Sequence, residues 1–150
     1  MTNPEEIRKL AYLRLKEADV LYNNGLFDGA FYLAGYSVEL MLKAKICERI
    51  NVPNLFDEKS TTIIEGISDI RKVVRTHNLF TLLIMSGLKN KFDADKASNK
   101  QLALSNSILF NRWSEESRYL PLGTCTDKNA ENLINLLSGK EGILQWIENN

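Results

Sequence analysis

Residues 28–50, DGAFYLAGYSVELMLKAKICERI, form the stretch that decides the predicted fold. Apolar residues occur almost all round the helix that this stretch would form, which is typical of a central, buried helix. Four polar side chains, Tyr32, Tyr36, Glu39 and Lys43, nevertheless fall within about 60° of one another at ~100° per residue. Because Glu39 precedes Lys43 by four residues, the two can form an ion pair in the favourable orientation. A charged stripe on a buried helix predicts a structural or functional role.

A second helix is expected directly before it, from residue 4 to about residue 23. Asn3 can cap this helix, and Pro4 suits its first turn. Gly25 lies in a turn that reverses the chain, and Asp28 is the expected cap of the helix that follows. The two helices are therefore predicted to form an antiparallel hairpin.

Arg14 lies in the middle of the apolar stripe of this first helix. Arg14 and Glu39 are each about a dozen residues from the turn, so an antiparallel hairpin brings them to nearly the same height. A buried Arg needs a carboxylate partner. We therefore predict an ion pair between Arg14 and Glu39 that fixes the register of the hairpin, in preference to a catalytic role.

The middle of the chain predicts shorter helices. A weakly marked helix is expected over about residues 62–74, and a clearer one begins after Asn78 and is closed by Gly87. The polar residues 88–96, LKNKFDADK, are expected to be exposed.

Two longer helices are expected in the second half. The first covers about residues 98–113, and Asn106 is a polar residue on its apolar stripe. The last begins after Thr126 or Asp127 and runs unbroken through Gly139 to Ile147. No run alternates between apolar and polar residues long enough to predict a strand, so residues 1–150 are expected to form one all-α domain, an up-and-down bundle of about five helices.

Charge and cysteine content exclude several classes of protein. Nineteen basic and nineteen acidic side chains cancel, so any nucleic-acid site must be a local patch. Residues 69–100 carry seven Lys or Arg and three Asp, a net +4 that suits either phosphate contacts or a solvated face. Cys47 and Cys125 suit reduced thiols in a cytoplasmic protein. No apolar run reaches the ~20 residues of a membrane span.

Common catalytic and cofactor motifs are absent from the sequence, which has no phosphate-binding glycine loop, nucleophile elbow or metal-binding cluster. His77 is the only histidine and has no carboxylate at ligand spacing, so neither a metal nor a cofactor is expected. We interpret His77 as a residue at the start of a helix whose ring bonds to the local backbone.

Four segments together resemble the HEPN superfamily (higher eukaryotes and prokaryotes nucleotide-binding). They are AYLRLKEADVLYNNGLFDGAFYLAGYSVELMLKAKI (residues 11–46), THNLFTLL (76–83), WSEESRY (113–119) and LQWI (144–147), and AGYSVELMLKA is the most specific part. The resemblance implies a homodimeric helical bundle from a bacterial defence, toxin-antitoxin or mobile-element context, often acting beside a nucleotidyltransferase-like partner. It also implies that many relatives are metal-independent ribonucleases, with an Arg, four to six further residues and a His late in the domain.

The sequence departs from this ribonuclease motif. Arg112 occupies the place where the resemblance puts the catalytic Arg, but Arg118 follows it where a His would be expected. Arg71 and His77 have the required spacing, but they lie earlier in the chain.

The function expected from the resemblance is therefore binding. We expect a non-catalytic HEPN-type module that binds a nucleotide, RNA or protein partner through Arg112, Arg118, Tyr119 and Lys43. The alternative is a metal-independent ribonuclease that uses Arg71 and His77. A homodimer is expected through the apolar seam of the helix over residues 98–113, where Trp113 lies near the end.

Overall fold

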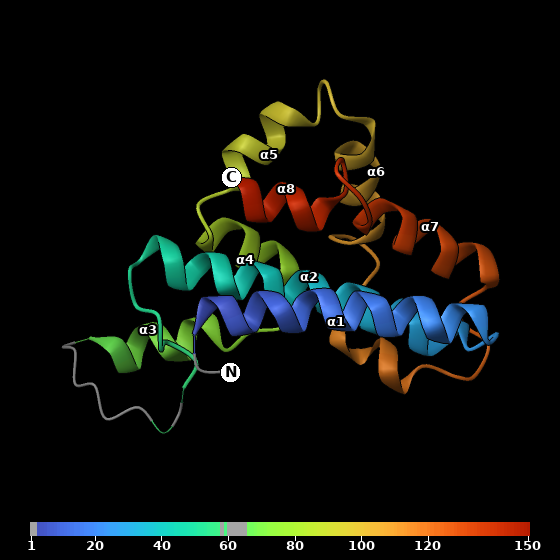
Figure 1. Ribbon diagram of the computed structural model, residues 1–150, viewed down its shortest axis with the longest axis horizontal. Helices are drawn as coiled ribbons and strands as arrows, with labels where there is room; N and C mark the ends of the chain where they lie inside the picture. The colour runs from blue at the N-terminus through green and yellow to red at the C-terminus, as the bar shows by residue number, and fades with distance from the viewer. Residues whose placement is uncertain (1–2, 58, 60–65) are drawn as a thin grey trace.

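The computed structural model describes residues 3–57, 59 and 66–150, and this part of the chain forms helices and no β-strand (Figure 1). The α-helices are α1 (Pro4–Asn23), α2 (Phe27–Arg49), α3 (Ile67–Val74), α4 (Leu79–Met85), α5 (Lys89–Asp95), α6 (Lys100–Ile108), α7 (Asp127–Leu137) and α8 (Ile143–Asn149), with a 3₁₀ helix η1 (Glu115–Tyr119) between α6 and α7. The predicted all-α bundle is confirmed. The expected number of about five helices is wrong, because eight α-helices occur in the described residues.

Helices α1 and α2 form the predicted antiparallel hairpin along the long dimension of the molecule (Figure 1). The Asn3 side chain caps α1 by accepting a hydrogen bond from the Glu6 amide at 2.9 Å. Gly25 turns the chain with a φ of +74°, in the left-handed region that favours glycine. Asp28 is not the cap of α2, because α2 begins at Phe27. Its carboxylate instead accepts hydrogen bonds from the amides of Gly123 and Cys125, at 2.7 and 2.8 Å.

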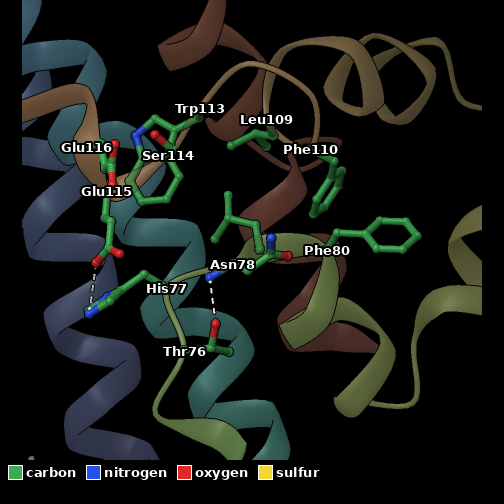
Figure 2. A pocket seen from close by; sticks show the side chains of 11 residues that line it. Thr76, His77, Asn78, Phe80, Leu109, Phe110, Trp113, Ser114, Glu115 and Glu116 are labelled. Atoms are coloured by element: carbon green, nitrogen blue, oxygen red, sulfur yellow. Dashed lines mark hydrogen bonds and ion pairs between the residues drawn. The ribbon is translucent and has the colours of Figure 1, made fainter. Parts of the chain in front are cut away.

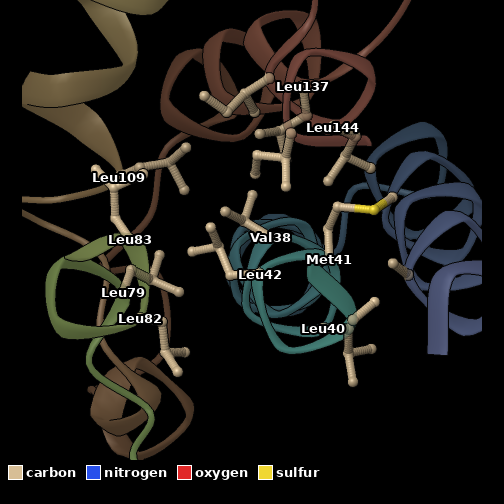
Figure 3. Close-up of a cluster of buried hydrophobic side chains, with 14 of the residues drawn as sticks. Val38, Leu40, Met41, Leu42, Leu79, Leu82, Leu83, Leu109, Leu137 and Leu144 are labelled. Atoms are coloured by element: carbon tan, nitrogen blue, oxygen red, sulfur yellow. The ribbon is translucent and has the colours of Figure 1, made fainter. Parts of the chain in front are cut away.

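Helix α2 is the central element, as predicted, because other helices surround it. Figure 3 shows Leu42 on the side of α2 that faces α4, Val38 on the side nearest Leu144 of α8, and Met41 on the side of α1. All three side chains are buried. A helix that packs on several neighbours needs apolar residues in several directions, which explains its nearly continuous apolar sequence.

The helix after Asn78 agrees with its sequence signals. The Asn78 side chain accepts a hydrogen bond from the Thr81 amide at 2.8 Å, and Gly87 closes the segment with a φ of +75°. Of the helix expected over residues 62–74, the structure has α3, and residues 62–65 lie outside the described residues. Residues 88–96, expected to be polar and exposed, instead include helix α5, in which Phe92 is buried. The centroid of the Phe92 ring lies 5.3 Å from that of Phe110 and 5.7 Å from that of Trp146.

Two helix boundaries differ from prediction. Helix α6 ends at Ile108, so Trp113 lies beyond the helix, and the chain is free to turn back towards α2. The predicted last helix is broken: α7 ends at Leu137, Gly139 has a φ of +81°, and α8 begins at Ile143. Both α7 and α8 bury one face in the same core, which explains why their apolar positions keep one phase in the sequence.

The two cysteines provide a simple check on burial. Both are free thiols; Cys47 is buried and Cys125 is half-buried. Burial raises the pKa of Cys47 to about 11, so at pH 8 roughly one molecule in a thousand carries the thiolate. We expect a disulfide reagent at pH 8 to label Cys125 first and Cys47 only after denaturation, as followed by mass spectrometry of proteolytic fragments. Equal labelling rates in the native protein would contradict the buried position of Cys47.

Within the described residues, no helix is both long and apolar enough to cross a membrane.

Candidate functional site

The polar stripe of α2 forms one end of a cluster of four charged residues. This cluster, called the Glu39 cluster below, consists of Glu39, Lys43, His77 and Glu115. Glu39 is 1% exposed, and its carboxylate accepts a hydrogen bond from Lys43 Nζ at 2.7 Å. His77 Nδ1 lies 2.9 Å and 3.1 Å from the two oxygens of Glu39. A buried carboxylate is costly unless it is paired and hydrogen-bonded, and Glu39 is both.

His77 joins α2 to η1. Its second ring nitrogen, Nε2, lies 3.1 Å from Oε2 of Glu115, the first residue of η1, and Figure 2 shows this contact at one end of a cavity. The expectation that the ring would bond to the local backbone is therefore wrong. Carboxylates only accept hydrogen bonds, so a ring with a proton on each nitrogen would satisfy both contacts, whereas a neutral ring could donate to only one of them. The His77 ring thereby connects the Glu39 carboxylate with that of Glu115.

The predicted ion pair between Arg14 and Glu39 does not form. Arg14 contacts Glu17, one turn further along α1, while Glu39 is occupied by Lys43 and His77. Arg14 lies on the same stripe of α1 as the buried Ile7, Ala11 and Ala18, but its own side chain is only half-buried and pairs within the helix. The prediction failed because each charge found another partner: Lys43 one turn along α2 and His77 take Glu39, and Glu17 takes Arg14.

Asn106, the other polar residue on a predicted apolar stripe, is half-buried on α6. The buried polar residue of this helix is its neighbour Ser105, whose hydroxyl donates to the Gln101 carbonyl at 2.7 Å. The helix therefore satisfies its buried hydroxyl internally.

A row of three aromatic rings lies along the same face of α2. Tyr36 and Tyr32 stack with centroids 6.2 Å apart, and Tyr32 stacks on Trp113 at 6.1 Å. The indole Nε1 of Trp113 donates to the Tyr32 carbonyl at 3.2 Å. This close approach requires Gly35, because a β-carbon at that position would overlap the indole ring. Burial, followed by the nearby Glu39 charge, raises the pKa of Tyr36.

Arg118 and Tyr119 extend this aromatic row to the surface. The Arg118 guanidinium lies 4.8 Å from the centroid of the Tyr119 ring, and its Nη1 donates to the Tyr32 hydroxyl at 3.5 Å. Tyr119 is 75% exposed. We call these two side chains the Arg118–Tyr119 platform. A guanidinium stacked on an exposed aromatic ring offers both a positive charge and a flat surface to a ligand.

Two cavities border η1. The first, of about 360 Å³, is bounded by His77, Glu115 and Trp113 and by the aromatic side chains Phe80 and Phe110 (Figure 2). The second, of about 220 Å³, contains Arg112 in its wall. Its other lining residues include hydroxyl and amide side chains and no carboxylate: Ser117, Thr124, Asn129 and Asn132. Positive charge therefore lies at both ends of residues 112–119, from Arg112 before η1 and from Arg118 in its last turn.

The remaining candidates have internal partners. The Arg71 guanidinium donates to the backbone carbonyls of Leu55, Asn54 and Asp57, at 2.9, 3.4 and 3.5 Å. Arg71 and His77 share no partner, because the His77 ring contacts Glu39 and Glu115. Lys43 is 7% exposed and its charge is paired with Glu39. Over the described ranges, no three His, Cys, Asp or Glu side chains group together as metal ligands would.

Sequence reasoning found the stripe of α2 and the segment of residues 112–119, but it missed that the two meet. Glu115 was not singled out, and no local pattern indicates that His77 reaches it. One signal was present: a glycine inside a strong helix, Gly35, indicates a close approach by another part of the chain.

We compared the chain with protein-family models, with curated proteins and with solved structures, and none of the three comparisons found a match. The likeness to the HEPN superfamily therefore stays a prediction from the sequence, and the function is argued from the contacts described above.

Proposed function

We propose that this chain is a non-catalytic HEPN-like module that binds RNA or a nucleotide through the Arg118–Tyr119 platform and the neighbouring Arg112. The observation that carries the proposal is the guanidinium of Arg118 stacked on the ring of Tyr119, which is 75% exposed. Proteins that bind single-stranded nucleic acid combine positive charge for the phosphates with aromatic rings on which bases stack. The platform supplies both in two adjacent residues.

The charge distribution supports an anionic ligand at this place. The ion pairs of the described residues include neither Arg112 nor Arg118, so both guanidinium groups keep their charge available. The Lys43 ammonium group, by contrast, forms an ion pair with Glu39, so we propose a structural role for Lys43 within the Glu39 cluster. Of the three kinds of partner implied by the resemblance, a nucleotide or RNA fits an exposed Arg on an exposed Tyr best.

We expect Tyr119→Ala to weaken binding of a fluorescein-labelled single-stranded RNA of ten nucleotides by about ten-fold or more, because stacking contributes ~1–3 kcal/mol per base. Arg118→Gln and Arg112→Gln should each weaken binding and reduce the dependence of affinity on salt, since each removes one phosphate contact. The measurement is fluorescence anisotropy at two salt concentrations.

The matched control is Lys140→Gln, which removes one positive charge from an exposed position between α7 and α8. It should leave affinity unchanged. The proposal fails if Tyr119→Ala, Arg118→Gln and Arg112→Gln all bind RNA as well as the parent protein, or if the parent binds neither RNA nor a mononucleotide at millimolar concentration.

One observation favours the alternative, a metal-independent ribonuclease. His77 lies at the rim of the larger cavity, held by the buried Glu39, and an imidazolium is a competent general acid. The proposed Arg71 partner is engaged with backbone carbonyls elsewhere. The test incubates purified protein and a His77→Ala variant with structured and single-stranded RNA in the presence of EDTA. Cleavage by the parent that is lost in the variant would establish the alternative, and we expect neither protein to cleave.

The resemblance also supports proposals on assembly. We propose a homodimer, a nucleotidyltransferase-like partner protein, and a place in bacterial defence or toxin-antitoxin systems. The dimer surface expected from the sequence needs revision, because Trp113 is buried against Gly35 of its own chain.

A further inference from the structure

Helices α6 and α7 pack side by side and leave a groove of about 320 Å³ between them (Figure 1). Among the described residues, uncharged side chains line this groove, three from each helix: Gln101, Leu104 and Ile108 from α6, and Asn132, Asn135 and Leu136 from α7. The three from α6 occupy positions i, i+3 and i+7, which lie on one stripe of a helix. We call it the α6–α7 groove.

Amide side chains supply the hydrogen-bonding groups of the α6–α7 groove. Asn132 and Asn135 are exposed, and in the described part of the chain neither side chain has a hydrogen-bond partner. Asn is a poor helix former, so its repeated use on this face of α7 brings no structural advantage. The Oε1 atom of Gln101 is buried and lacks a partner within the same residues. Because Gln101 lines the groove and the terminal torsion of Gln is broad, a rotation of its amide can pair this oxygen with a donor on a ligand.

The α6–α7 groove continues into the cavity that contains Arg112, because Ile108 and Asn132 line both. Positive charge is thus available at one end, and the other end is an apolar slot with amides. A nucleotide has the same division, with a charged phosphate and a flat, uncharged base that carries donors and acceptors at its edge. An extended peptide also bonds to amides, but it brings no phosphate for Arg112. The groove by itself falls within the ~300–1,000 Å³ typical of small-molecule sites.

We propose that the α6–α7 groove receives one base of the nucleotide or RNA whose phosphate is held by Arg112, and that the amides of the groove select this base. The proposal rests on the proposed function and adds base selectivity to it. An aromatic ring such as Tyr119 stacks on any base, so the Arg118–Tyr119 platform gives affinity without selection. Amides discriminate, because a base with the wrong donors and acceptors leaves polar groups of the site unpaired.

The test is isothermal titration calorimetry of the whole chain with the four ribonucleoside 5′-monophosphates and with ribose 5-phosphate, which has the phosphate but no base. The parent should bind the best mononucleotide about ten-fold or more tighter than both the worst one and ribose 5-phosphate. The double variant Asn132→Leu with Asn135→Leu keeps the size of the side chains and removes their hydrogen-bonding groups. It should bind all four mononucleotides alike, within about three-fold, and ribose 5-phosphate as the parent does.

Leu is the better helix former, so α7 should stay intact, as far-ultraviolet circular dichroism verifies. Gln101→Met changes the opposite wall and should also lower the discrimination among bases, by about three-fold or more, which keeps the test valid if the double variant does not fold. The control is Asn90→Leu, at an exposed position of α5 outside the groove, which should leave the discrimination unchanged.

The outcomes separate this inference from the proposed function. A parent that binds the mononucleotides without discrimination would overturn the role of the α6–α7 groove and leave RNA binding by the platform standing. The same holds for discrimination that persists in the groove variants, or that Asn90→Leu also removes. Discrimination that depends on Asn132 and Asn135, together with RNA affinity that is unchanged in Tyr119→Ala and Arg118→Gln, would support the groove and overturn the platform. A parent that binds neither RNA nor a mononucleotide would overturn both.

Discussion

Replacing Glu39 by alanine is expected to destabilise the protein by about 3–5 kcal/mol, because it leaves a buried charge without its partner. Lys43 is 7% exposed, and its ammonium group donates to the Glu39 carboxylate at 2.7 Å. The same substitution removes the Nδ1 partner of His77, which connects α2 with η1. The free energy of unfolding is measured by urea denaturation, followed by circular dichroism.

Glu17→Ala is the matched control for Glu39→Ala. It removes the partner of Arg14, a contact between partly exposed side chains, and should cost no more than about 1 kcal/mol. Adding Lys43→Met to Glu39→Ala should recover part of the loss, because no charge is then left unpaired in the core. A Glu39→Ala variant as stable as Glu17→Ala would show that the Glu39 cluster is open to water.

Replacing Gly35 by alanine should also destabilise the protein, by about 1–3 kcal/mol net, although alanine is the better helix former by ~1 kcal/mol. The added methyl group would overlap the indole of Trp113, which is buried and hydrogen-bonded to the Tyr32 carbonyl. The indole would have to leave its place in the aromatic row. Urea denaturation reports the loss of stability, and a red shift of tryptophan fluorescence in a Trp146→Phe background reports movement of Trp113 into water.

Gly29→Ala is the matched control for Gly35→Ala on the same helix. A β-carbon at Gly29 would approach only the end of the Leu21 side chain, at 3.3 Å, so this variant should be neutral or slightly more stable. In a Trp113→Ala background Gly35→Ala should become harmless, since the group that it displaces is absent. If Gly35→Ala stabilises the parent protein as Gly29→Ala does, the close approach of Trp113 to α2 is wrong.

Boundaries that depend on local chemistry were predictable from the sequence. Asn3 and Asn78 supply side-chain oxygens to the amides of the first turns of α1 and α4, and Gly25 and Gly87 adopt left-handed conformations where those segments end. Gly139 is likewise a glycine at a helix end, but the apolar residues on its two sides keep one helical spacing, which suggested a continuous helix. The left-handed backbone at Gly139 ends that helix in the structure, and periodicity cannot distinguish two helices that pack on one core.

Partners within the candidate site were less predictable, because a carboxylate bonds to whichever cation the fold brings closest. The stripe of Glu39 and Lys43 follows from helical spacing, and this ion pair forms as spacing allows. Arg14 lies on the buried stripe of α1, as predicted, but it pairs with Glu17 on its own helix, a choice that the stripe alone does not determine. His77 and Glu115 are 38 and 76 residues from Glu39 in the chain, and no local pattern records that they meet.

Sequence by itself determined that this protein is all-α, that an antiparallel hairpin of two long helices begins it, and that the second helix is buried on nearly every side while carrying a polar stripe. These features follow from hydrophobic periodicity and capping, which act over a few residues. Only the tertiary structure decided that His77 rather than Arg14 reaches Glu39, that Trp113 turns back onto Gly35, and that Arg118 and Tyr119 lie beside Tyr32. Those contacts join segments far apart in the chain, and their geometry is set by how whole helices pack.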